Sequence, residues 1–566
     1  WDETTNSIVQ APGTGRADKP FGRDRRKYGT LELGDIKPSL EGRWIANTLD
    51  GEVEVTTVFE LLKEECENYT PQMASEITGV SPKVIEQTAR VFADAQPGMI
   101  YAGYASCKWL HGDLLQRAML LMLALTGSTG KEGGGLQIAN SPNARGLTQF
   151  GFSDVGPAFR LISGTTWDYD HADMKELNSK IYGNELAEKF DRYYKKSIEE
   201  DWFPDYSQNG WKMGIFAGNN GANWRASGST WRKTAFEELE TIVSLAPDMG
   251  VTSLFSDYVL PIAHHYERND LMLQSRVPYL QVLTEAVSPL GEAVDDWEAN
   301  RRLAEAISRR AKERGIKPIQ DAVDGRTIRR DYTKTLDLYT MDGRVNDSKD
   351  VAQFIINASH GVPKISFEEL SQKGIVKVEG VDNTMWDKDE SPYHNEIVKS
   401  VQKKLPYETF TGRQQFYIDH EWFIEFGETL PTFKEPLKIE GYPMRMMMGH
   451  ARHGIHSTWR DDSFLLSLQR GEPDIYVNPD DASKRGVSDG DMIRIYNSAG
   501  EFSAMAHVSS GIQPGMLFMY HGWDPKMFKD GKNFSEVIPT GGLIKPTSMA
   551  GDYGHLGYQP LAFAPN

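Results

Sequence analysis

The 566-residue sequence has few cysteines, no long hydrophobic run and no excess of positive charge. With only Cys66 and Cys107, it has neither a disulfide framework nor a thiol cluster that could ligate iron or zinc. The apolar run near Ala118–Leu125 is far shorter than the roughly 20 residues of a transmembrane helix. The formal net charge of −18 argues against a nucleic-acid-binding surface. These absences leave a globular chain for which we expect no membrane span and no nucleic-acid partner.

The composition is that of an ordinary folded protein, with 39% hydrophobic and 25% charged residues. The length suggests about two to four domains. The chain begins at Trp1 rather than Met, and residues 1–50 follow an irregular pattern. We expect residues 1–50 to be the tail of an upstream domain, and the chain to be a fragment.

Residues 51–312 alternate between strand and helix patterns. Short apolar stretches at 98–102, 212–217 and 241–245 each lead into a polar loop, and a long helical pattern at 114–125 follows the first. This alternation predicts an α/β domain built on a doubly wound parallel sheet. Residues 313–430 are charged and weakly periodic, which predicts a linking region with a solvated surface.

Residues 431–566 alternate strands with turns. Apolar stretches at 444–448 and 474–477 are followed by the alternating stretch 492–496. We expect Asp480 and Asp481 to cap a short helix at 482–485 that Gly486 ends. The pattern predicts a smaller, separate β-barrel-like domain.

Several stretches carry a resemblance to a known family. VNPDDASKRGVSDGDMIRIYNSAG (477–500) resembles the C-terminal cofactor domain of the molybdopterin oxidoreductases of the dimethyl sulfoxide reductase family. HGDLLQRAMLLMLALTGSTGKEGGG, GNNGANW and APDMGVTSLFSDYVLP occur in the order typical of that family's central α/β domain. The closing IKPTSMAGDYGHLGYQP is similar to the subgroup of catalytic alpha subunits that includes nitrate, selenate, chlorate and perchlorate reductases, dimethyl sulfide dehydrogenase and ethylbenzene dehydrogenase.

The resemblance implies an oxidoreductase with molybdenum held by two molybdopterin guanine dinucleotides, performing two-electron oxygen-atom transfer or hydroxylation. It also implies a four-iron four-sulfur cluster, an iron–sulfur electron-transfer beta subunit and, in some relatives, a haem b gamma subunit. A periplasmic location is implied, with the cytoplasmic face of the membrane as the alternative. The ligands of the cluster and of molybdenum are expected upstream of Trp1, so no metal ligand is named here.

The candidate cofactor-binding residues lie in loops after predicted strands, where backbone amides, hydroxyls and amide side chains can approach a pyrophosphate. For one cofactor arm they are Gly218, Asn219, Asn220, Trp224, Asp248 and Thr252. For the second arm and its pterin they are His450, Arg452, His456, Ser457, Thr458, Asn478, Asn497, Tyr553 and His555. Asp248 has the alternative role of a turn cap, and Tyr553 that of a core residue. The spacing of His450, His453 and His456 also suggests zinc, without a thiol or carboxylate to support it.

Lys108, flanked by Trp109 and His111, is the candidate for substrate chemistry, because it lies in a loop after a parallel strand. A cation in a partly dry pocket stabilises negative charge on a reacting oxygen. The alternative is a surface lysine beside a packed tryptophan. Relatives that resemble ethylbenzene dehydrogenase carry a lysine in this loop, so the resemblance favours oxidation of an organic or sulfur substrate over reduction of an oxyanion.

Two other classes of function stay open. The chain could be a non-catalytic subunit that keeps the cofactor fold within an electron-transfer complex. It could also be a plain nucleotide-binding α/β protein, although that hypothesis leaves the 477–500 stretch unexplained. Molybdenum content and an upstream cysteine motif would separate the catalytic subunit from the non-catalytic one.

Overall fold

The structure is a computed structural model. The residues that it describes are 1–13, 29–103, 111–131, 133–138, 169–199, 205, 207, 210–225, 228–273, 279–323, 326–359, 362–378, 398–407, 412–419, 421–454, 456–468, 471–538, 543–550 and 555–561. Lys108, Trp109 and Tyr553 lie outside this set, and so does the side chain of His555.

A hairpin and three helices precede the first parallel strands. Strands β1 (Arg43–Thr48) and β2 (Gly51–Thr56) pair as an antiparallel hairpin in which Thr48 is the partner of Gly51, so Leu49 and Asp50 form the turn. The helices are α1 (Val58–Cys66), α2 (Pro71–Thr78) and α3 (Pro82–Asp94). Proline at the first position of α2 and α3 costs no hydrogen bond, because the first amides of a helix have no partner within it.

Parallel pairing defines the central part of the chain. Strand β3 (Met99–Ala102) pairs with β4 (Gly135–Ile138), and α4 (Gly112–Leu125) lies between them in sequence. A second sheet has the order β5 (Met213–Ala217), β6 (Thr241–Ala246) and β7 (Tyr258–Pro261). The predicted α/β class with parallel strands is confirmed. Among the described residues of 51–312, however, the parallel strands lie in two separate sheets and not in the single doubly wound sheet that we expected.

The largest hydrophobic cluster joins this region to helices from elsewhere in the chain. Helices α7 (Met174–Tyr182), α8 (Asn184–Glu199) and α17 (Glu421–Phe426) pack around the short helix α10 (Gly228–Lys233) and β6. Phe190 and Tyr193 of α8 are almost fully buried there, and each such side chain contributes about 1.5–3 kcal/mol. The short helices α9 (Gly221–Trp224) and α11 (Val251–Leu254) follow β5 and β6.

Residues 270–377 include a small antiparallel sheet with its own core. Strand β12 (Ile375–Lys377) comes from the predicted linking region and pairs with β9 (Tyr279–Leu283), which pairs with β8 (Asp270–Leu273). Leu280, Ile356 and Leu370 form the centre of its core. The other elements here are α12 (Asp296–Glu313), β10 (Ile319–Val323), β11 (Arg326–Arg330), α13 (Thr335–Tyr339), α14 (Ser348–Ala358) and α15 (Phe367–Lys373). Helix α16 (Val398–Gln402) follows farther along the chain.

The C-terminal region contains a five-stranded sheet of order β13-β17-β14-β16-β15. Its strands are β13 (Arg445–Gly449), β14 (Asp474–Val477), β15 (Met492–Tyr496), β16 (Glu501–Val508) and β17 (Met516–Tyr520). The pairs β13–β17 and β14–β16 are parallel, whereas the other two pairs are antiparallel. The sheet is open, with β13 and β15 at its edges, so the described strands do not close into the expected barrel.

Two helices accompany this sheet, α18 (Ser463–Leu468) and α19 (Pro479–Lys484). The cap of α19 is Asn478, whose side chain accepts from the Asp480 amide at 2.8 Å, and not the predicted Asp480 or Asp481. The two aspartates occupy the first turn, where a negative charge is favourable at the helix N-terminus. Strands β18 (Leu543–Ala550) and β19 (His555–Leu561) pair with each other as a separate hairpin.

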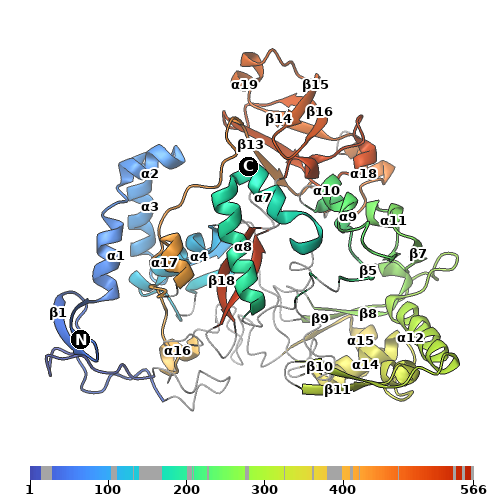
Figure 1. The fold of residues 1–566 in the computed structure, drawn as a ribbon, viewed down its shortest axis with the longest axis horizontal. Helices are drawn as coiled ribbons and strands as arrows, with labels where there is room; N and C mark the ends of the chain where they lie inside the picture. Colours follow the sequence, from blue (N-terminus) through green and yellow to red (C-terminus); the bar gives the residue numbers. More distant parts are fainter. Residues whose placement is uncertain are drawn as a thin grey trace.

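The C-terminal sheet lies against the central region. Figure 1 shows it, in orange and red, above α7, α9 and α10. A short 3-10 helix after β17 (Phe534–Glu536) contacts α10. None of the helices in the described part of the chain combines the length and the apolar character that crossing a bilayer requires.

Candidate functional site

The loops after β5 and β6 are held together by one asparagine. Because both strands are parallel, their carboxyl ends meet at the same edge of the sheet. Asn220 Oδ1 accepts hydrogen bonds from Thr252 N at 3.0 Å and Thr252 Oγ1 at 3.2 Å. The Thr252 hydroxyl in turn accepts from the Ala222 amide at 3.1 Å. Gly218 turns the chain at φ +59°, a conformation that glycine adopts without strain.

The side chain of Asn220 uses its oxygen, but not its nitrogen, in these hydrogen bonds. Asn220 Nδ2 is buried and has no hydrogen-bond partner among the described residues. A Cβ at Gly250 would lie only 3.2 Å from this nitrogen, so glycine leaves the space in front of it. A buried donor without a partner costs roughly 1–3 kcal/mol, which a bound acceptor would recover.

Arg460 connects the β6 loop to the C-terminal region. Its Nη1 donates to Asp248 Oδ2 at 3.1 Å and to the Ser457 carbonyl at 3.0 Å. Its Nε donates to Asp524 Oδ2 at 2.5 Å. The Arg460 side chain is 5% exposed and that of Asp524 0%, whereas Asp248 is 46% exposed. The buried Arg460 guanidinium therefore links the buried Asp524 to Asp248, which still reaches solvent.

Asp524 and Arg460 depend on each other for charge compensation. Burial raises the pKa of the Asp524 carboxyl, and the adjacent Arg460 guanidinium limits that rise. Burial lowers the pKa of Arg460, but the hydrogen bonds and charges of Asp524 and Asp248 outweigh it and keep the pKa above its ordinary value. The guanidinium therefore stays charged, and Asp524 needs it in order to remain ionised.

Further polar contacts extend this link across the two regions. Asn223 Nδ2 donates to Asp524 Oδ1 at 3.2 Å, and Asn533 Nδ2 donates to Asn223 Oδ1 at 2.7 Å. Beside them, Arg232 and Glu536 form a buried ion pair at 2.9 Å. Each contact joins the segment after β5 to the segment after β17. We call Asn223, Asp248, Arg460, Asp524 and Asn533 the interdomain network.

One donor of this network has no acceptor in the part of the chain that the structure describes. Arg460 Nη2 is buried and has no hydrogen-bond partner among the described residues. Asn220 Nδ2 is a second such donor, which faces Gly250, two residues after the half-exposed Asp248 in sequence. Guanidinium and amide donors suit phosphate oxygens, and a carboxylate suits the N–H or O–H groups of a base or ribose. These residues therefore fit a phosphate-containing dinucleotide.

The loop that carries Arg460 has an unusual backbone. His456 and Trp459 have positive φ angles of 52° and 62°, which are uncommon outside glycine and often occur at functional sites. The Trp459 ring lies 5.0 Å from that of His264, which follows β7. This loop therefore contacts the β5–β7 region at two points.

The predicted histidines of this loop meet a third one that we did not predict. Ligand atoms of His450, His456 and His521 lie within 4.8 Å of one another. His453, which the zinc alternative included, is not part of the group. His450 and His456 therefore come together as expected for one site, with His521 from the end of β17.

Other predicted residues have local roles or stay exposed. Asn478 donates to the Ile512 carbonyl at 2.6 Å besides capping α19, and Asn497 holds a turn through the Ala499 amide at 2.9 Å. Their assignment to the cofactor stays a prediction. The Trp224 ring is 42% exposed, with the Arg225 guanidinium 5.3 Å from its centre. Asn219, Arg452 and Thr458 are exposed.

His111 is the one candidate catalytic residue that the structure describes. It is buried before α4, and its Nδ1 lies 2.7 Å from Oε1 of the fully buried Glu428. Arg117 of α4 donates to the carbonyls of Glu428 and Thr429 at 2.7 and 2.6 Å. The start of α4, next to the Lys108 loop in sequence, is thus tied to residues of the predicted linking region.

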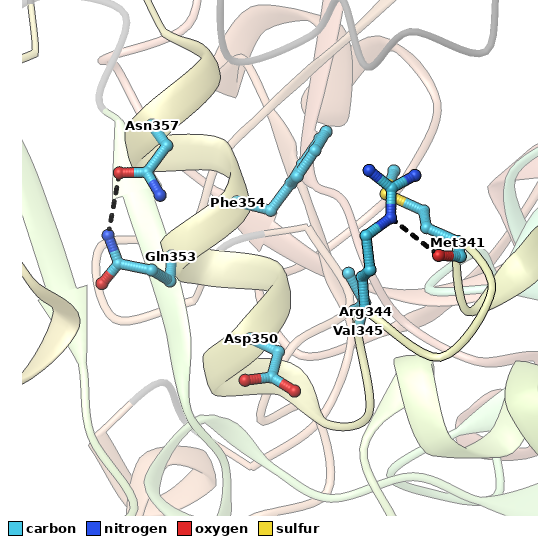
Figure 2. Close-up of a pocket in the computed structure, with 7 residues that line it drawn as sticks. All are labelled: Met341, Arg344, Val345, Asp350, Gln353, Phe354 and Asn357. Carbon is cyan, nitrogen blue, oxygen red and sulfur yellow. Dashed lines mark hydrogen bonds between the residues drawn. The ribbon is translucent and has the colours of Figure 1, made fainter.

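A surface cavity of about 200 Å³ lies elsewhere, on α14 and the turn before it. Figure 2 shows two hydrogen bonds beside this cavity, from Gln353 to Asn357 and from Arg344 to the Met341 carbonyl. It includes none of the predicted site residues.

Sequence reasoning missed Arg460, Asp524, Asn223, His521 and Glu428. Asn223 lies within a stretch already singled out, GNNGANW, but nothing local marks it as a contact of the C-terminal region. The roles of these residues arise from contacts between residues far apart in sequence, such as Asn223 with Asp524.

Comparison with known proteins agrees with this geometry. Residues 58–306 match the molybdopterin oxidoreductase family, and residues 444–554 match the molydopterin dinucleotide binding domain. The two matched segments contain the residues that meet in the interdomain network.

Three curated relatives cover nearly the whole chain. They are the respiratory nitrate reductase subunit alpha of Haloferax mediterranei (33% identity over 100% of this chain), the dimethylsulfide dehydrogenase subunit alpha of Rhodovulum sulfidophilum (32% over 99%) and the perchlorate reductase subunit alpha of Dechloromonas aromatica (34% over 100%). The chain spans 58%, 60% and 62% of their respective lengths. Among solved structures, acetylene hydratase from Pelobacter acetylenicus has a similar fold, with a TM-score of 0.55, 17% identity and coverage of 85% of this chain and 62% of that one.

Proposed function

Because the chain belongs to the molybdopterin oxidoreductases of the dimethyl sulfoxide reductase family, we propose that it forms the cofactor-holding part of a catalytic alpha subunit. The enzyme would carry molybdenum with two molybdopterin guanine dinucleotides. The observation that carries this proposal is a pair of buried donors that have no acceptor among the described residues: Arg460 Nη2, where the two matched segments meet, and Asn220 Nδ2, in the loop after β5.

The metal, when bound, supplies the two-electron redox chemistry. The residues of this chain hold and orient the group that carries it. Arg460 and Asn220 would donate to phosphate oxygens, and Asp248 would accept from a guanine or ribose donor. The interdomain network would keep Arg460 and Asp248 in place when the cofactor loads, because its members are already hydrogen-bonded to one another. Thr252 would hold Asn220.

For the substrate, we propose two-electron oxygen-atom transfer or hydroxylation, with a preference for oxidation of an organic substrate as in ethylbenzene dehydrogenase. Lys108 supports this preference, since a cation in that loop stabilises charge on the transferred oxygen. The names of several relatives favour a second candidate, a respiratory reductase of an oxyanion such as nitrate, perchlorate or chlorate. The resemblance of the closing sequence adds selenate to these oxyanions. A non-catalytic subunit with the same cofactor fold is the remaining alternative.

The partners follow from the same proposal. Relatives named as alpha subunits suggest an assembly with further subunits. We propose an iron–sulfur beta subunit that exchanges electrons with a four-iron four-sulfur cluster near the molybdenum, and a haem b gamma subunit as in some relatives. We propose a periplasmic location, with the cytoplasmic face of the membrane as the alternative.

The Asn220→Asp variant tests the proposed donor. Aspartate keeps the oxygen that accepts from Thr252, but it replaces the free N–H donor with a second, negative oxygen facing a phosphate. A hydrogen bond to a charged group is worth about 1.5–3 kcal/mol, so retention of the guanine dinucleotide should weaken on the order of tenfold or more. Cofactor content of the purified protein, measured as released guanine nucleotide, gives the result.

Asn357→Asp is the matched control. It adds the same charge at an exposed position of α14 and keeps the oxygen that accepts from Gln353. Its cofactor content should equal that of the unsubstituted protein. If Asn220→Asp also retains full cofactor, Asn220 is a structural residue and the first arm lies elsewhere.

A further inference from the structure

Three imidazoles gather at one edge of the C-terminal sheet. The side chains are His450, His456 and His521, and the ligand atom of each lies within 4.8 Å of the other two. Their ring centroids are 4.6, 4.6 and 5.3 Å apart. In the described part of the chain, this is the one group of three or more histidine, cysteine or acidic side chains with metal-ligand spacing.

The parallel pairing of β13 and β17 brings two of the histidines together. Gly449 and Tyr520 are partners at the ends of the two strands, so the next residues, His450 and His521, leave the sheet side by side. The His521 amide donates to the Gly449 carbonyl at 3.0 Å and continues the pairing by one step. The backbone therefore sets the distance between these two rings.

The third histidine is held by close backbone packing. His456 has a φ of +52°, and a Cβ at Gly522 would lie 2.0 Å from the His456 carbonyl oxygen. Any side chain at position 522 would push His456 away, and Gly522 itself has a φ of +104°. Glycine directly after His521 is thus a condition for the third ring to join the other two.

The chemistry of this group suits a borderline-soft divalent ion. Neutral imidazole nitrogens bind zinc, copper, nickel and cobalt, whereas magnesium and calcium prefer oxygen ligands. Three imidazoles around one ion leave a fourth tetrahedral position for water. His450 and His456 are exposed and His521 is half-buried, so an ion from solvent can reach all three.

We propose that the cofactor-free chain binds one divalent transition-metal ion, of the zinc type, through His450, His456 and His521. We further propose that this ion and the pterin cofactor exclude each other. The second statement rests on the proposed function, in which His450 and His456 contact the second cofactor arm. Metal occupancy would then hold the loop of His456 against the ends of β13 and β17 before the cofactor loads.

Cobalt(II) provides a direct probe, because four-coordinate cobalt absorbs visible light far more strongly than hydrated six-coordinate cobalt. The chain is purified without cofactor, stripped with a chelator and titrated with Co²⁺, and Zn²⁺ is then added to displace it. We expect one Co²⁺ per chain with the intense four-coordinate spectrum, and its loss on addition of Zn²⁺. Second-shell changes already cost about 10–100-fold in metal affinity, so His521→Ala and His456→Ala, which remove ligands, should weaken binding on the order of 100-fold or more.

His453→Ala is the matched control, since His453 lies in the same exposed loop but outside the group. It should bind Co²⁺ like the unsubstituted chain. His521→Gln and circular dichroism provide a second variant and a folding check, and a folded His521→Gln chain should also lose the four-coordinate spectrum. Equal loss in His453→Ala, or only the weak six-coordinate spectrum in the unsubstituted chain, would overturn the metal site.

Cofactor-loaded protein tests the exclusion. It should give no four-coordinate Co²⁺ spectrum, and strong binding to loaded protein would overturn mutual exclusion. The two proposals fail separately. If the cofactor-free chain gives no four-coordinate spectrum although the enzyme as isolated carries pterin, only the metal site is refuted. A chain that binds Co²⁺ but is never found with pterin refutes only the proposed function.

Discussion

Replacing Arg460 by methionine should destabilise the protein by about 3–5 kcal/mol and remove most of its cofactor. Methionine retains apolar bulk but leaves the Asp524 carboxylate, which is 0% exposed, without the guanidinium at 2.5 Å. Removing one partner of a buried ion pair has about this cost, because the other charge remains buried. Lys526, 3.8 Å from Asp524 and half-exposed, offsets little of it. Urea denaturation followed by tryptophan fluorescence, with released guanine nucleotide as the second readout, measures both effects.

Two further variants separate the buried pair from a general loss of charge. Arg494→Met removes an arginine from the exposed pair with Glu501, at 3.2 Å, and should cost less than about 1 kcal/mol. In the double variant Arg460→Met/Asp524→Asn the stranded charge is gone, so it should be more stable than the sum of the single effects. If Arg460→Met is as mild as Arg494→Met, the network does not hold the two regions together.

Replacing Lys108 by methionine should lower turnover about a hundredfold, or roughly 3 kcal/mol in the activation barrier, while molybdenum and pterin content stay unchanged. The change keeps the bulk of the side chain and removes the cation proposed to stabilise the transferred oxygen. His111, three residues after Lys108, is buried, and its Nδ1 lies 2.7 Å from the Glu428 carboxylate. Turnover of the loaded enzyme, measured with an organic substrate and with nitrate or chlorate, gives the result.

Lys83→Met, at an exposed position near the start of α3, serves as the control and should leave turnover unchanged. A Lys108→Met enzyme with full molybdenum and near-normal turnover would make Lys108 a surface or packing residue. The preference for an organic substrate would then lose its support, and the oxyanion reductase would become the better proposal.

The sequence was most informative where a feature is decided by neighbouring residues. The strand at 492–496 and the helix at 114–125 depend on the local hydrophobic pattern, and the structure confirms them. Even so, the cap of α19 was assigned to Asp480 or Asp481 rather than Asn478, because each of the three side chains can cap a helix.

Long-range pairing was not predictable in the same way. The C-terminal sheet mixes parallel and antiparallel neighbours, so its strand order cannot be read from turns between consecutive strands. Strand β12 is only three residues long and is defined by its partner β9, which comes much earlier in the chain. Residues 313–430, which contain β12, are charged and weakly periodic, so their sequence gave no local sign of that pairing.

One part of the candidate site could be predicted from local sequence, and another part arises only from long-range packing. Asn220, Asp248 and Thr252 lie in loops after strands, and the rule for parallel sheets places such loops at one edge. Arg460, Asp524 and Asn223 become a unit only when the C-terminal region packs on the β5–β7 region. A residue such as Asp524 is buried because of that contact, and its sequence neighbours do not reveal it.

The central claim is that this chain holds a molybdenum cofactor with two guanine dinucleotides, one contacted mainly by each matched segment. Metal analysis combined with quantification of guanine nucleotide released by mild acid hydrolysis tests it most directly on active enzyme containing this chain. We expect one molybdenum and two guanine nucleotides per chain. Active enzyme without molybdenum or tungsten, or without bound guanine nucleotide, would contradict the claim.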